Sequence, residues 1–302
     1  MDRELETFKT AVNLVAYAQS QGYQLNRRRS TQISAVLSHS DGHKIVVSRF
    51  PDGHWVYFTV GDDGRDSGSI IDFVKNRLNL NLGQVRKHLR DWAPGSIPIN
   101  AMPELKIPKP LDRERIQKVF SEFRPFSQSR YLQIERKIDD TILLDKRFRG
   151  TIFENAAGEI IFAHHDESGL CGFERKGPAG AWFSAGGARA LWSANVLPGD
   201  DTIVITESPI DALSHYQLFP NPAAQFVATC GAPGPEQWKQ LLRTIDRLPN
   251  SRVVAAFDAD ETGDNLADKV RVIVGDSRFR RARPPQFKDW NEELIGEGRA
   301  KK

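Results

Sequence analysis

The chain has 302 residues, of which 39% are hydrophobic and 27% are charged, and its formal net charge is +3. This is the composition of a globular protein of one large domain or two, and it excludes a collagen-like or fully disordered chain. No apolar run approaches the roughly 20 residues that a membrane-spanning helix needs, and the first residues lack the pattern of a secretory signal. Cys171 and Cys230 are the only cysteines, which excludes a disulfide scaffold and a four-cysteine zinc site. We therefore expect a cytoplasmic protein without a membrane partner.

Basic residues gather in two places, at Arg27–Arg29 and between Arg278 and Arg283. Such clusters can neutralise phosphates, which makes a nucleic acid one candidate partner. A solvated basic face is the other interpretation, and the sequence leaves both open at this point.

The first part of the chain predicts helices around a small antiparallel sheet. Residues 4–21 carry apolar side chains at helical spacing, and Gly22 ends that helix. Alternating apolar residues over 33–60 predict a β-hairpin or small antiparallel sheet. Two more helices are expected over 69–78 and 82–92.

Five prolines between 93 and 110 exclude a helix or a central strand there. This stretch predicts a linker and a domain boundary near residues 100–110, so we divide the front into a domain at 1–95 and a linker at 96–110. A β-rich middle segment at 111–200 follows. It is expected to contain helices over 112–123 and 128–136, and strands at 142–144, 151–153, 160–163 and 171–174.

From residue 201 the pattern changes to buried strands that alternate with helices. Such alternation predicts a parallel sheet covered on both faces. The fold class is therefore α/β and α+β, and a C-terminal domain at 201–302 has about four parallel strands between helices. The expected strands span 202–206, 225–229, 252–257 and 280–283, and the expected helices span 211–219, 236–248, 263–274 and 288–295.

Acidic side chains stand where two of these strands end. Glu207 follows the strand at 202–206, and Asp258 and Asp260 follow the strand at 252–257. Ligands of open α/β sheets bind beyond the carboxyl ends of the strands, and convergent carboxylates need a cation such as Mg²⁺. Asp211 lies one helical turn beyond Glu207. Helix capping is the alternative explanation for each residue taken alone.

These segments resemble the Toprim domain of bacterial primases, topoisomerases and some nucleases. The resemblance rests on TIVITESPIDAL at 202–213, VVAAFDADETG at 253–263 and KDWNE at 288–292, the last of which is similar to Toprim proteins of plasmids and other mobile elements. It implies that Glu207, Asp258 and Asp260 form the catalytic site and bind Mg²⁺ or Mn²⁺. Asp211 is implied as a further metal ligand, and Lys288 and Asp289 as residues at the nucleotide.

The middle segment resembles the region that precedes Toprim in primase-like proteins of mobile elements, through YLQIER at 131–136, GFER at 172–175 and SAGG at 184–187. The resemblance implies binding of a single-stranded template. The candidate aromatic side chains for base stacking are Trp182, Phe183 and Trp192, for which packing is the alternative. The candidate phosphate contacts are Arg175, Lys176, Arg189, Arg280, Arg281 and Arg283.

The front is similar to the zinc-ribbon domain of bacterial primases, through WVYF at 55–58 and GSIIDFV at 68–74. That ribbon binds zinc through cysteines and histidines, but this segment contains no cysteine. Because His39, His43 and His54 alone are a poor zinc set, we expect a degenerate ribbon-like domain that is held by an apolar core, and no structural zinc.

Three functions follow from these resemblances. The first is a primase of a plasmid or mobile element that joins nucleoside triphosphates on single-stranded DNA, with a helicase or relaxase of the same element as a further partner. The second is a Toprim nuclease, and the third is a non-catalytic protein that binds single-stranded nucleic acid. The order of segments favours the primase.

Overall fold

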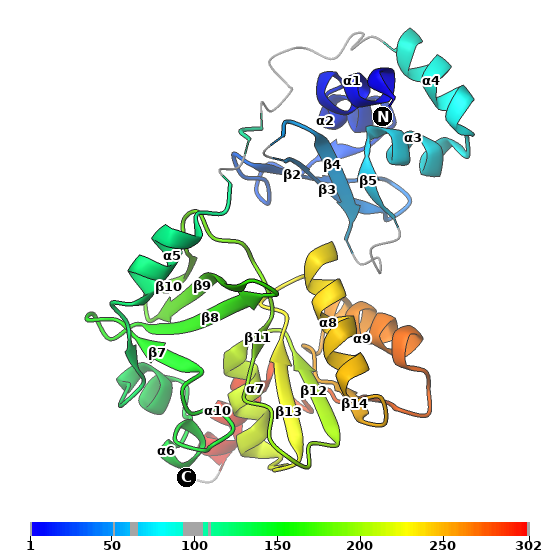
Figure 1. Cartoon of the computed structure of the whole chain (residues 1–302). Coiled ribbons are helices and arrows are strands. Elements are labelled where there is room, and N and C mark those ends of the chain that lie inside the picture. The colour runs from blue at the N-terminus through cyan, green and yellow to red at the C-terminus, as the bar shows by residue number, and fades with distance from the viewer. Residues whose placement is uncertain (1, 51, 61–65, 93–104, 108–109, 301–302) are drawn as a thin grey trace. The chain divides into compact units, whose positions relative to one another are not determined.

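The computed structural model describes residues 2–50, 52–60, 66–92, 105–107 and 110–300, with the backbone alone at 297–300. The chain folds into two compact units, 1–110 and 111–302, which Figure 1 colours blue to cyan and green to red. None of the helices in the described ranges is long and apolar enough to cross a membrane.

The first unit is a five-stranded antiparallel sheet in the order β1-β2-β3-β4-β5, with helices packed on it. Burial alternates along β2 and β3, which is why one face of the sheet carries the core. This confirms the small antiparallel sheet expected over 33–60. Its elements are α1 (Arg3–Ala11), α2 (Leu14–Ser20), β1 (Gln24–Leu25), β2 (Ser34–Ser38), β3 (Lys44–Arg49), β4 (Trp55–Thr59), β5 (Ser67–Ser69), α3 (Ile70–Leu78) and α4 (Leu82–Asp91).

The single helix expected over 4–21 is wrong, because the chain breaks at Val12 and Asn13 into α1 and α2. The Asn13 side chain accepts hydrogen bonds from the backbone N–H groups of Val15 and Ala16, so it begins a new helix. The apolar periodicity continues through the break, which hides it from a pattern based on spacing alone.

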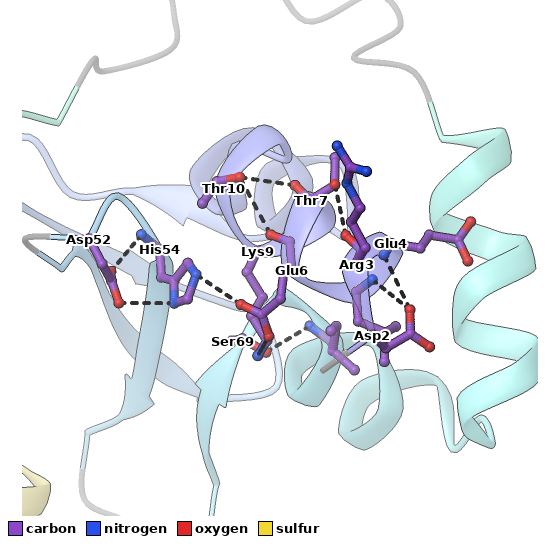
Figure 2. A network of polar contacts seen from close by, with 12 residues as sticks. Asp2, Arg3, Glu4, Glu6, Thr7, Lys9, Thr10, Asp52, His54 and Ser69 are labelled. Atoms are coloured by element: carbon purple, nitrogen blue, oxygen red, sulfur yellow. Dashed lines mark hydrogen bonds and ion pairs between the residues drawn. The ribbon is translucent and has the colours of Figure 1, made fainter.

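The three histidines considered as zinc ligands are each paired with carboxylates. Figure 2 shows His54 between Asp52 and Glu6, with ring nitrogens 3.2 Å from a carboxylate oxygen on each side. His39 and His43 pair with Asp41. The centre of this unit is aromatic, because Phe73 meets the rings of Tyr17 and Tyr57 edge-on at 5.9 and 5.0 Å.

The expected linker at 96–110 lies mostly outside the described residues. In its described part, Leu105 is buried in the core of the first unit. The backbone N–H of Lys106 donates to the carbonyl oxygen of Gln32 at 2.8 Å. This short stretch is therefore packed on the first unit.

The middle segment forms an antiparallel sheet in the order β10-β9-β8-β7-β6. The strand expected at 142–144 is wrong. The carbonyl oxygen of Asp139 accepts hydrogen bonds from the backbone N–H groups of Ile142 and Leu143, so a helical turn forms there. Its elements are α5 (Arg113–Phe120), β6 (Arg124–Pro125), a π-helical segment (Tyr131–Glu135), α6 (Asp140–Leu143), β7 (Ile152–Glu154), β8 (Ile160–Asp166), β9 (Gly169–Gly177) and β10 (Gly180–Phe183).

The C-terminal sheet has the order β11-β13-β12-β14-β15. The last four strands are parallel to one another and β11 is antiparallel to β13, which confirms the expected four parallel strands. Its elements are β11 (Trp192–Ser193), β12 (Thr202–Thr206), α7 (Pro209–Leu218), β13 (Ala224–Ala228), α8 (Pro235–Arg247), β14 (Arg252–Ala255), α9 (Glu261–Val274), β15 (Phe279–Arg281) and α10 (Trp290–Ala300).

Helices cover both faces of this sheet. One face packs against α8 and α9, which lie side by side in Figure 1. The other face packs against α7 and α10, and the same core contains Phe148, Ile160 and Phe162 of the middle segment. Because this core is continuous, the middle segment and the C-terminal sheet form one unit.

A buried ion pair also joins these two parts. Arg147, in the turn before β7, donates to both carboxylate oxygens of Asp200, at 2.7 and 2.5 Å. It also donates to the carbonyl oxygens of Asn195 and Pro222. Both charged side chains are almost fully buried, so loss of either partner would leave an uncompensated charge.

The stability of the second unit should depend on pH through His215 of α7. Its ring lies 4.7 Å from the Trp290 ring, and burial together with the charge of Arg280 lowers its pKa to about 4. The unfolded state binds a proton near pH 6.5 and the folded state only near pH 4, so stability falls as pH decreases between these values. The loss attributable to His215 is up to about 3 kcal/mol.

Chemical denaturation of the wild type and His215→Phe between pH 4.5 and 7.5 checks this. As the pH decreases, the unfolding free energy of the wild type should fall more than that of His215→Phe. A difference that does not vary with pH would show that His215 is not the group responsible.

Candidate metal and nucleotide site

The sheet topology brings the acidic residues together. β12 pairs directly with β14 in parallel register, so Glu207 and Asp258 follow neighbouring strands at the same edge. The backbone N–H of Asp258 donates to a carboxylate oxygen of Glu207 at 3.3 Å. The candidate catalytic residues Glu207, Asp258 and Asp260 therefore lie where the sequence predicts them.

Hydrogen bonds with three residues later in the chain, Arg281, Lys288 and Trp290, hold the loop that carries Asp258 and Asp260. Arg281 of β15 donates to the carbonyl oxygens of Phe257 and Asp258, at 2.8 and 2.7 Å. Trp290 of α10 donates from its indole nitrogen to the carbonyl oxygen of Ala256 at 2.8 Å. The backbone of Ala259 donates to the carbonyl oxygen of Lys288 at 2.7 Å. These contacts fix where the carboxylates stand.

The carboxylates at this edge of the sheet repel one another. Burial, followed by the charges of Glu207, Asp211 and Asp289, raises the pKa of Asp258 to about 8. Burial also raises the pKa of Glu207, and the charges of Asp260 and Asp211 add to that effect. The site is therefore costly to ionise fully until a cation is present.

Asp260 is in a different environment from Asp258. Its side chain accepts the N–H of Gly263 at 2.9 Å and caps α9. Its second oxygen lies 3.3 Å from the ammonium nitrogen of Lys288. The Gly263 hydrogen bond, followed by that of Lys288, lowers the pKa of Asp260, so this carboxylate is ionised at neutral pH. Asp260 therefore caps α9, and its role as a metal ligand stays a prediction.

Asp211 and Asp289 lie beside this group. Asp211 is buried and accepts the Ser208 hydroxyl at 2.6 Å. Burial, with the charge of Asp289 next, raises the pKa of Asp211 to about 6. Asp289 accepts the backbone N–H of Glu292 at 2.7 Å, so it also caps the start of α10.

The donor set fits a hard divalent cation. All the candidate ligands are carboxylates, and their mutual repulsion would be relieved by Mg²⁺ or Mn²⁺. Glu207, Asp258 and Asp260 are not among the described groups whose ligand atoms all lie within 4.8 Å of one another. An ion here would therefore take one or two of these carboxylates together with water and substrate phosphates, which is how Mg²⁺ is usually bound.

A cavity of about 350 Å³ adjoins Asp211 and Asp289. Arg136 and Tyr131 of the middle segment line it, as does Lys176 of β9. Arg136 donates to the Tyr131 hydroxyl at 2.8 Å. Sequence reasoning missed Tyr131 and Arg136 as site residues, although both lie in the YLQIER segment that carried the resemblance.

The β9–β10 hairpin pairs exposed basic and aromatic side chains. Arg175 and Trp182 face each other across the two strands, with the guanidinium 4.8 Å from the indole centre. Arg189 lies 4.7 Å from the centre of the Phe183 ring. We name these four residues the hairpin platform. Trp192 does not join it, because it is buried in the core and stacks on Phe148.

The other basic residues are separate from the hairpin platform. Arg281 uses its guanidinium internally, on the loop after β14 and on Asp264. Arg283 is half-exposed and pairs with Asp264. Arg280 is exposed, and together with Arg283 it lines a groove of about 820 Å³ beside His215.

Gly263 is required by the close approach of α9 to the loop. A Cβ at this position would lie 2.2 Å from the carbonyl oxygen of Asp258. Gly263→Ala should therefore destabilise the protein by about 1–3 kcal/mol, as overpacking does, and displace Asp258. Gly83→Ala in α4 is the matched control, because its nearest atom would lie at 3.4 Å. Urea denaturation of both variants checks this, and equal unfolding free energies would contradict the packing argument.

Two parts of the chain match known family models. Residues 204–294 match the family model described as Toprim-like, and residues 130–196 match a family described as a protein of unknown function, DUF3991. The comparison with curated proteins finds no match.

Among solved structures, the primase fragment of the bacteriophage T7 primase-helicase is similar, with a TM-score of 0.43, 18% identity, and coverage of 84% of this chain and 90% of that chain. The RNA polymerase domain of the Mycobacterium tuberculosis primase DnaG gives a TM-score of 0.33 and 17% identity, and covers 58% of this chain and 66% of that chain. Because these scores are low, the functional argument rests on the site itself. Residues 204–294 thus form a Toprim-like domain whose candidate ligands are Glu207, Asp258 and Asp260.

Proposed function

We propose that this chain is a primase-type nucleotidyltransferase that joins nucleoside triphosphates on a single-stranded DNA template. Glu207, Asp258 and Asp260 are the proposed ligands of Mg²⁺ or Mn²⁺. The observation that carries the proposal is the juxtaposition of these carboxylates at the carboxyl ends of two adjacent parallel strands, within the Toprim-like match. A divalent ion there would neutralise triphosphate charge and orient the phosphates.

Lys288 has two proposed roles at this site. Its ammonium group now neutralises Asp260 at 3.3 Å. If a divalent ion bound that carboxylate, Lys288 would be free to contact a phosphate as a point charge. The cavity beside Asp211, with Arg136 and Lys176 in its wall, is the proposed place for the incoming nucleotide.

The hairpin platform is the proposed template contact. Single strands bind where cations follow the backbone and aromatic rings stack on bases. Arg175 and Trp182 provide that combination on one exposed surface. Because the middle segment shares its core with the Toprim-like sheet, this platform is held in a fixed relation to the carboxylates. A helicase or relaxase remains a proposed further partner.

A primer-synthesis assay tests the activity. The wild type, with single-stranded DNA, labelled nucleoside triphosphates and Mn²⁺ or Mg²⁺, should give short labelled products. Asp258→Asn should reduce the rate at least about 100-fold, because it removes a charge at the metal while keeping the shape. Asp276→Asn is the control, since Asp276 is exposed and pairs with Arg271.

The other outcomes identify the alternative functions. Metal-dependent shortening of the DNA that is lost in Asp258→Asn would show a nuclease. Binding of the strand without synthesis or cleavage under either ion would support a non-catalytic binding protein. Equal synthesis by the wild type and Asp258→Asn would contradict the assignment of the site.

The hairpin platform gives a separate prediction about affinity. Trp182→Ala should weaken binding of single-stranded DNA by about 10-fold, because a stacked base contributes roughly 1–3 kcal/mol. Arg175→Gln should weaken binding and reduce its salt dependence. Arg271→Gln is the matched control, because both arginines are part-exposed and paired with a carboxylate. Fluorescence anisotropy over a salt series measures these effects, and unchanged affinity in Trp182→Ala would exclude the platform.

A further inference from the structure

Three buried side chains with metal-binding atoms meet away from the carboxylate site. His164 of β8, Glu174 of β9 and Cys230 after β13 each offer one ligand atom, and these atoms all lie within 4.8 Å of one another. All three residues are at least nine-tenths buried. His164 and Glu174 lie on paired neighbouring strands, whereas Cys230 comes from a loop much later in the sequence, and we name the three residues the buried triad.

His164 supplies the independent observation. Its side chain is fully buried, and its Nδ1 lies 2.7 Å from the carbonyl oxygen of Ala190 and 3.1 Å from the backbone nitrogen of the same residue, of which the carbonyl contact is the shorter. Its Nε2 has no hydrogen-bond partner in the part of the chain that the structure describes. Metal-bound histidines are commonly held in this way, with one ring N–H donated to a backbone carbonyl and the other nitrogen directed at the ion.

The other two members leave this nitrogen without a donor. Glu174 is an acceptor, and its Oε2 has no hydrogen-bond partner among the described residues, although Lys176 lies 3.4 Å away as an ion pair. The Cys230 thiol is directed at the carbonyl oxygen of Ala228, at 3.7 Å. When Nδ1 donates to Ala190, Nε2 carries a lone pair that no described group satisfies, and a cation bound by both Nε2 and the Glu174 carboxylate would satisfy these two buried acceptors.

We propose that the buried triad binds a transition-metal ion of the zinc class through His164 Nε2, a Glu174 oxygen and Cys230 Sγ. Imidazole, carboxylate and thiolate together favour Zn²⁺ over the Mg²⁺ or Mn²⁺ of the all-carboxylate site. Zinc bonds of about 2.0–2.3 Å place neighbouring ligands about 3.5 Å apart, so the three atoms, which lie within 4.8 Å of one another, would need to approach by about 1 Å at most. A water molecule is the proposed fourth ligand.

The charges around the buried triad are compatible with this ion. Glu174 and the Cys230 thiolate would balance the charge of Zn²⁺. Arg189 and Lys176 approach the Glu174 carboxylate at 3.4 Å each. Arg189 also donates to the carbonyl oxygen of Cys230 at 3.2 Å, which holds the cysteine backbone beside the carboxylate.

The position of the buried triad gives the ion a structural role. It would join the antiparallel sheet of the middle segment to the loop that follows β13. Cys230 has a left-handed backbone, with φ of 57°, a conformation that a side chain other than glycine adopts only when its surroundings hold it. The next residue, Gly231, donates its N–H to the carbonyl oxygen of Glu207 at 3.1 Å. The ion would thus stiffen the loop beside the carboxylate site without touching substrate.

Metal analysis of the full chain tests the proposal independently of any enzymatic activity. The protein is expressed with zinc, freed of loosely bound ions by gel filtration, and analysed by mass spectrometry for metals. The wild type and Cys171→Ser should each retain about one zinc per chain, and Cys230→Ser should lose it. Cys171 is the matched control, because it is buried but does not belong to the buried triad.

Cobalt binding provides a second readout, which still tests the proposal if Cys230→Ser fails to fold. The wild type, stripped of zinc and given Co²⁺, should show a thiolate-to-cobalt charge-transfer band, and a strong chelator should lower its melting temperature. Glu174→Gln, checked as folded by circular dichroism, should bind Co²⁺ at least 10-fold more weakly. Less than a tenth of an equivalent of zinc in the wild type, with no cobalt band and no effect of the chelator, would overturn the proposal.

Discussion

The arrangement of the candidate site depends on how the loop after β14 is held in place. It carries Asp258 and Asp260, and its carbonyl oxygens are bound by Arg281 of β15 and by the indole of Trp290. Gly263 allows the start of α9 to approach the backbone of Asp258. Each of these contacts comes from an element later in the chain, so the carboxylates reach their positions only when the parallel sheet and α10 are complete.

Holding buried carboxylates together costs free energy, and the surroundings of the site reduce that cost in different ways. Asp258 keeps a raised pKa, whereas Asp260 is neutralised by Lys288 and by the N–H of Gly263. A divalent ion would remove the remaining repulsion. Phe148 and Phe162 of the middle segment share a core with α7, which fixes the position of the hairpin platform relative to the carboxylates. The proposed template and nucleotide contacts therefore lie in one unit.

Much of this arrangement could be predicted from local sequence. The strand at 202–206 is a continuous apolar run, and the parallel topology then places Glu207 and Asp258 at one edge. What failed depended on contacts or caps that spacing does not reveal. Asn13 caps a second helix inside one apolar period, and Asp139 starts a helical turn where a strand was expected. The buried triad unites β8, β9 and the loop after β13, so no spacing motif indicates it. The zinc-ribbon resemblance and the mobile-element origin stay predictions, and the proposed ion at the buried triad opposes the expectation of no structural zinc.

Direct binding of Mn²⁺ tests the central claim, that the carboxylates at the ends of β12 and β14 form a divalent metal site. The free ion can be titrated by electron paramagnetic resonance, in the presence and absence of a nucleoside triphosphate. The wild type should remove Mn²⁺ from solution, more tightly with the nucleotide, and Glu207→Gln with Asp258→Asn should weaken this at least 10-fold. Equal binding by the wild type and the double variant would contradict the account.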